Sequence, residues 1–132
     1  MDAAELSRIA RGHGVRLILE FGSSMTGALH AGSDLDIAVV LDGEDGLERR
    51  ARLLHDLQAL VAGREVDLAV LNHADPLFLK QVTDHCRLLY GTATDLARLK
   101  LLAFKRYQDH RKYFDLERAF VARAIGGSPA RG

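Results

Sequence analysis

The chain has one cysteine and a net charge of zero, and both features narrow the classes of function that it can have. The single cysteine, Cys86, excludes an internal disulfide, and one cysteine with scattered histidines does not form a zinc-binding pattern. We therefore expect a buried, unreactive thiol. Eighteen basic and eighteen acidic residues cancel, so no overall field attracts nucleic acid or a membrane surface. Nucleic acid is not expected as the main partner.

Long apolar runs are also missing. No stretch is long enough to cross a bilayer, and residues 1–5 do not begin a signal peptide, so we expect a cytoplasmic protein without a membrane partner. The 132 residues, 48% hydrophobic and 27% charged, are typical of one globular domain.

Lysine and arginine are absent between Gly22 and Val40, although this stretch contains two aspartates. Asp34 and Asp36 stand at the start of a strand expected over residues 35–41, and their spacing places both carboxylates on one side of it. Two close carboxylates need a shared proton, a basic partner or a divalent cation. The lack of basic residues in this stretch favours the cation.

A turn of small residues precedes the two aspartates. Gly22, Ser23 and Ser24 can present backbone N–H groups and hydroxyls to an anion, and Ser33 directly before the acid pair is a further nucleotide-binding candidate. A phosphate cradle beside a metal site suits a nucleoside triphosphate. The alternative is an ordinary turn that leads to a solvated strand end.

A third carboxylate comes from the strand expected over residues 64–71. Asp67 shares one face of this strand with Ala69 and Leu71, and the other face carries Val66, Leu68 and Val70. If this strand lies next to strand 35–41 on the same core, Asp67 comes onto the face of Asp34 and Asp36. Three carboxylates would then surround one metal centre.

These residues together resemble a known signature. Gly22-Ser23, Asp34-Leu35-Asp36 and the later Asp67 resemble the polymerase-beta-like nucleotidyltransferase superfamily, and the ten-residue gap is similar to that of its minimal nucleotidyltransferases, the MNT proteins. Residues from about 15 to 90 resemble the MntA-type antitoxins, which pair with HEPN-domain toxins. The resemblance implies an α+β fold with a small mixed sheet, flanking helices and a long C-terminal helical segment.

The resemblance also implies a reaction. Asp34, Asp36 and Asp67 would hold Mg²⁺, with Asp67 as base, and the Gly22-Ser23 turn would hold the terminal phosphates of ATP. AMP would pass to a tyrosine of a cognate HEPN toxin within a hetero-oligomer. Many relatives carry an arginine where this chain has Thr26, and the missing charge leaves open a non-catalytic antitoxin that blocks its toxin by binding. Transfer to a small-molecule hydroxyl is a further alternative.

The C-terminal quarter differs in character from the rest. Thr94 or Asp95 can begin a helix that runs to about Ile125 and reaches roughly 45 Å. Apolar and aromatic side chains along it either pack on the sheet or form a docking surface for a partner. We predict a core over residues 1–92, a helical segment over 93–125, and a disordered tail over 126–132.

Other elements follow from periodicity and capping residues. Helices are expected over residues 2–11, over 47–61 and after Asp75-Pro76, and further strands over 15–21 and 87–90. Helix 47–61 is expected to cover the sheet with a stripe of apolar residues, namely Leu47, Ala51, Leu54, Leu57 and Val61.

Overall fold

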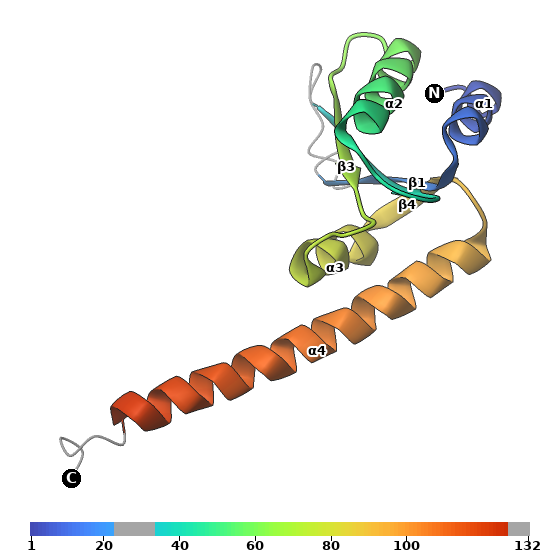
Figure 1. Cartoon of the computed structure of the whole chain (residues 1–132). Helices are drawn as coiled ribbons and strands as arrows, with labels where there is room; N and C mark the ends of the chain where they lie inside the picture. Colours follow the sequence, from blue (N-terminus) through green and yellow to red (C-terminus); the bar gives the residue numbers. More distant parts are fainter. Residues whose placement is uncertain (23–33, 127–132) are drawn as a thin grey trace.

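A four-stranded sheet with helices on both faces forms the body of the protein, and one long helix extends from it (Figure 1). The computed structural model describes residues 1–22 and 34–126. The elements are α1 (Ala3–His13), β1 (Val15–Phe21), β2 (Leu35–Leu41), α2 (Leu47–Leu60), β3 (Val66–Val70), α3 (Pro76–Asp84), β4 (Cys86–Tyr90) and α4 (Ala93–Gly126).

The sheet is mixed, as the α+β expectation requires. Its order is β3-β2-β1-β4, in which β1 pairs antiparallel with both β2 and β4, while β2 and β3 are parallel. Helix α2 forms the crossover between the two parallel strands, which no short turn can join. The prediction of 87–90 as an edge strand is confirmed, because β4 closes one side of the sheet.

Each face of the sheet is covered by two helices. Helices α1 and α2 pack on one face around Ile18, Ile37 and Val39, while α3 and α4 cover the other face around Leu17 and Leu19. A register shift between Val15 and Leu17 moves Val15 and Ile18 onto the same face. At this bulge β1 therefore departs from the simple alternation of a regular strand.

Two helices differ from their predicted form. Helix α1 continues through Gly12 and ends at Gly14, whose φ of 66° is the left-handed conformation that glycine adopts easily. Asp2 caps it by accepting a hydrogen bond from the backbone N–H of Ala4. In α2 the buried residues are Leu53 and Leu57, whereas Leu47 is exposed, so the predicted stripe was partly wrong.

Helix α4 is one continuous element of 34 residues, which corresponds to roughly 51 Å. Thr92, rather than Thr94 or Asp95, supplies the capping oxygen, which accepts from the backbone N–H of Asp95. Leu99 and Ala103 are buried against the sheet and α3. Past α3 the helix projects away from the body (Figure 1). The helix includes Gly126, and the rest of the predicted tail lies outside the described residues.

Within residues 1–22 and 34–126, none of the helices combines the length and the apolar character needed to traverse a bilayer.

Candidate functional site

Two of the predicted carboxylates occupy directly paired positions at one end of the sheet. Asp36 on β2 pairs with Asp67 on β3, and on its other side Asp36 pairs with Phe21 at the end of β1. Neighbouring strands lie about 4.8 Å apart, so the two side chains leave adjacent backbones on the same face. The two strands are therefore adjacent, which is the condition for Asp67 to share a face with Asp36. The face is the one covered by α3 and α4, because Ala38 and Ala69 follow with the same alternation.

Gly22 lies immediately against the carboxylate of Asp36. A Cβ atom built on Gly22 would lie 2.1 Å from Oδ2 of Asp36, and the φ of Gly22 is +80°. Glycine is therefore required twice, by the left-handed backbone and by the close approach. The chain thus leaves β1 with its backbone beside a carboxylate.

Asp34 lies one residue before β2 and is exposed. Its backbone carbonyl accepts a hydrogen bond from Nη2 of Arg64 at 3.2 Å, and the N–H of Leu35 donates to the carbonyl of Glu65 at 2.8 Å. These contacts bring a guanidinium group to the start of β2. Arg64 was not predicted from the sequence, because it lies outside the Gly22–Val40 stretch in which basic residues were sought.

The described residues do not include every predicted ligand of the nucleotide and the metal. Ser23, Ser24 and Ser33, predicted to bind nucleotide, lie outside the described residues. Among the residues that the structure describes, no three His, Cys, Asp or Glu side chains form a ready metal-binding group. Protein Mg²⁺ sites commonly use one or two carboxylates together with substrate phosphates and water. The carboxylates of Asp36 and Asp67, which stand at paired strand positions, fit that donor set.

The surroundings of the carboxylates include an aromatic pair and a thiol. Phe21 of β1 meets Phe78 of α3 edge to face, with ring centroids 5.8 Å apart. Cys86 pairs with Phe21 on the neighbouring strand, and burial raises the pKa of its thiol. A raised pKa disfavours the thiolate, which is the nucleophilic form of cysteine. At this end of the sheet the carboxylates of Asp36 and Asp67 are the groups suited to bind a cation or accept a proton.

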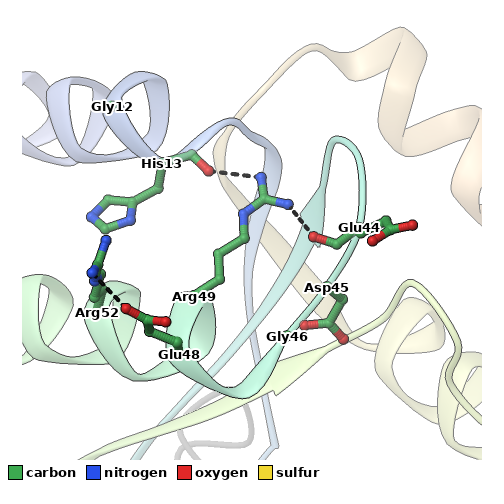
Figure 2. A pocket seen from close by; sticks show the side chains of 8 residues that line it. All are labelled: Gly12, His13, Glu44, Asp45, Gly46, Glu48, Arg49 and Arg52. Carbon is green, nitrogen blue, oxygen red and sulfur yellow. Dashed lines mark hydrogen bonds and ion pairs between the residues drawn. The ribbon is translucent and has the colours of Figure 1, made fainter.

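A hollow lies near the opposite end of β2, between α1 and α2 (Figure 2). Its volume is about 580 Å³. Arg49 crosses it and donates to the backbone carbonyls of His13 (2.9 Å) and Glu44 (2.6 Å), while Arg52 donates to Glu48 (2.6 Å). These bonds tie the end of α1 to the β2–α2 connection, so the charged groups hold the fold together.

The acids around this hollow also have basic partners. Asp45 accepts a hydrogen bond from Arg50 at 2.7 Å, which holds the pKa of Asp45 below its usual value. Outside the hollow's lining, the hydrogen bond from His13 likewise lowers the pKa of Asp56. Both carboxylates are therefore anions engaged in structural contacts. We assign this region to stability and place the functional site at Asp36 and Asp67.

Comparison with known proteins agrees with the fold. Residues 4–95 match the model of the family described as Polymerase beta, Nucleotidyltransferase. No curated protein matches the chain. Among solved structures, the chain is similar to one in a toxin–antitoxin complex with AMP-PNP, at 25% identity and a TM-score of 0.73, over 95% of this chain and 98% of that one.

Two further structures are similar in fold. One contains the tri-AMPylated HEPN toxin of Shewanella oneidensis in complex with an MNT antitoxin; the identity is 23% and the TM-score 0.66, over 93% of this chain and 94% of that one. The other is a spectinomycin adenyltransferase of Enterococcus faecialis with ATP and spectinomycin; the identity is 18% and the TM-score 0.56, over 73% of this chain and 57% of that one.

Proposed function

Because the chain belongs to the polymerase beta nucleotidyltransferase family, we propose that it is an antitoxin that transfers AMP from ATP to a tyrosine hydroxyl of a HEPN-domain toxin. The observation that carries the proposal is the direct pairing of Asp36 with Asp67, beside a glycine that closely approaches Asp36. The similar solved complexes, which contain AMP-PNP in one case and a tri-AMPylated HEPN toxin in another, support the donor and the acceptor.

In this proposal each carboxylate has a stated task. Asp36 and Asp67, together with Asp34, would hold Mg²⁺, and the ion would offset the negative charge of the triphosphate when bound. Asp67 accepts the proton of the acceptor hydroxyl. The hydroxyl oxygen then forms a bond to the α-phosphorus, and the bond to the β-phosphate oxygen breaks, so that pyrophosphate leaves with the electron pair. Gly22 keeps the backbone close to the reacting groups without a side chain that would displace Asp36.

Arg64 supplies the positive charge that the turn lacks at Thr26. Its guanidinium lies at the backbone of Asp34, where the triphosphate approaches in this proposal. We expect Arg64→Ala to raise the KM for ATP about tenfold, since a hydrogen bond to a charged group contributes about 1.5–3 kcal/mol. Steady-state kinetics of AMP transfer measures this change.

A matched control for Arg64 stands elsewhere on the sheet. Arg16 forms an exposed ion pair with Asp42 at the far end of β2, and surface pairs of this kind contribute little. Arg16→Ala should leave the KM for ATP unchanged, whereas Arg64→Lys should retain most of the affinity. An equal effect of the Arg16 and Arg64 variants would remove Arg64 from the nucleotide site.

The proposed function is tested by intact-mass analysis. A HEPN-domain protein from the same source as this chain is incubated with the chain, ATP and Mg²⁺. Its mass should rise in multiples of one AMP, and its ribonuclease activity should fall in step. A toxin that is bound and silenced without any mass gain would overturn the transferase proposal and support the binding-only antitoxin. A transfer of AMP to a small molecule in place of the toxin would also contradict it.

A further inference from the structure

The last four turns of α4 carry an apolar surface that no described element covers. We call it the distal face; its six side chains are each 45% to 70% exposed, and they are Tyr113, Phe114, Leu116, Phe120, Val121 and Ile125. Figure 1 shows this part of α4 extending past α3 into open space. Polar side chains would keep this part of the helix folded and soluble, so three exposed aromatic side chains call for another explanation.

The size of the distal face is unusual for the surface of a monomer. Tyr113, Phe114 and Phe120 are 67%, 50% and 70% exposed. Their three side chains alone therefore present roughly 350 Å², taking about 200 Å² for each aromatic side chain. A contiguous apolar patch larger than a few hundred Å² usually marks an interaction site. With Leu116, Val121 and Ile125 added, the distal face approaches the area that one partner buries in a specific interface.

One half of the distal face continues a stripe that already packs in the core, whereas Tyr113 and Phe120 lie on the neighbouring side of α4. Along one side of α4, Leu99 and Ala103 are buried against the sheet and α3, and Tyr107 lies under the ammonium group of Lys80 on α3, 5.0 Å from the ring centroid. Phe114 and Val121 follow on the same side at helical spacing. A partner that contacts them therefore lies alongside α4 where α3 stops.

A groove marks this point of transition. It has a volume of about 380 Å³ and lies where the start of α3 meets α4; it is lined by Leu77, Tyr107, His110, Arg111, Phe114, Asp115 and Arg118. The guanidinium of Arg118 lies 5.3 Å from the centroid of Phe114, and the rings of His110 and Phe114 are 6.2 Å apart. The groove thus combines an aromatic wall with two guanidinium groups.

The charge of this region indicates which kind of partner fits. Residues 104–126 carry six Lys or Arg and three Asp or Glu, a net charge of +3, whereas the rest of the chain carries twelve and fifteen, a net charge of −3. Pairing of two α4 helices from two copies would bring like charges together. An apolar surface flanked by acidic residues is the complementary partner.

We propose that the distal face and its groove are the surface on which the HEPN-domain partner docks, through an apolar helical surface edged with acidic side chains. This inference rests on the proposed function for the identity of the partner. In this proposal residues 1–92, the expected core, carry out the reaction, and residues 93–125, the expected helical segment, bind the substrate protein.

The test compares apolar-to-aspartate changes on two exposed helices. Phe114→Asp and Phe120→Asp place a charge in the distal face, while Leu47→Asp does so on α2, where Leu47 is 84% exposed and far along the chain from α4. Binding to the purified HEPN-domain partner is measured by calorimetry, and folding by thermal denaturation. Each distal variant should weaken binding about 30-fold, as loss of a central aromatic contact does. Leu47→Asp should bind as the wild type does.

The same variants separate docking from catalysis. Phe120→Asp should raise the KM for the toxin and leave the KM for ATP unchanged, because the carboxylates lie on the sheet. Undiminished toxin binding by both distal variants would overturn the docking proposal. So would a wild-type dimer that Phe120→Asp dissociates, since the face would then belong to a second copy.

The docking proposal and the proposed function fail in different ways. If the wild type binds the toxin, loses it through Phe120→Asp and yet adds no AMP, docking stands and the transferase proposal falls. If AMP is added and the distal variants bind normally, docking falls alone. A wild type that does not bind the HEPN-domain protein overturns both.

Discussion

The variant Asp34→Asn/Asp36→Asn should lose AMP transfer by about 1000-fold or more while it keeps its fold. Asparagine has nearly the same shape as aspartate but carries no charge, so the site can no longer hold a divalent cation against a triphosphate. A loss of this size corresponds to about 4 kcal/mol of transition-state stabilisation, a value consistent with removing a metal-held charge. Single-turnover transfer, followed by the mass of the toxin, measures it.

The control for the acid pair comes from the same strand. Asp42 lies directly after β2, at the end away from Asp36, and pairs with Arg16 on the surface. Asp42→Asn should therefore change transfer less than twofold. The double variant should also still bind the HEPN-domain partner, since docking is assigned to α4. Full transfer by the double variant would refute the carboxylate mechanism, and loss of toxin binding would show that the site and the docking surface overlap.

Gly22→Ala should lose both stability and activity. The φ of +80° makes alanine unfavourable by about 1–2 kcal/mol, and the new Cβ would lie 2.1 Å from Oδ2 of Asp36, so the carboxylate must move. A displacement of about 1 Å in a catalytic group can reduce a rate by about 100-fold. We expect that loss in transfer, beyond the loss of stability seen in thermal denaturation.

A second glycine separates the two effects. Gly63 has a φ of +77°, and a Cβ there would meet no atom within 4 Å. Gly63→Ala should therefore share the backbone penalty of about 1–2 kcal/mol and keep normal transfer. If the Gly22 and Gly63 variants lose the same stability and both remain active, the close approach of Gly22 to Asp36 has no role in catalysis.

Local features of the fold are readable in the sequence because they depend on near neighbours. Alternation of apolar residues places Val66, Leu68 and Val70 on one face of β3, and they pack together as expected. Asp75 caps α3 by accepting from the backbone N–H of Leu77, with Pro76 at the first helical position. In each case the responsible groups lie within a few residues of one another, so spacing alone carries the information.

Periodicity failed where packing depends on the other elements. Helices cover both faces of β1, so Ile18 and Glu20 are buried as well as the residues on the opposite face. Alternation alone does not show that both faces are covered. The bulge after Val15 then changes which residues share a face. Leu47 lies at the first position of α2, beyond the reach of the sheet, and stays exposed despite its helical spacing. A periodic pattern names a face but not what covers it.

By itself, the sequence determined the mixed α+β fold, the Gly22 turn and the acid pair that carries the family resemblance. Only the tertiary structure decided that Asp36 pairs with Asp67 and that Arg64 lies at Asp34, because strand register and loop contacts join residues about 30 positions apart. It also decided that α4 packs as far as Tyr107 and then leaves the body, since the first turn of α3 lies beside this point and no described element covers α4 beyond it. The spacing of near neighbours can be read from the sequence, whereas contacts between distant elements form only when those elements pack.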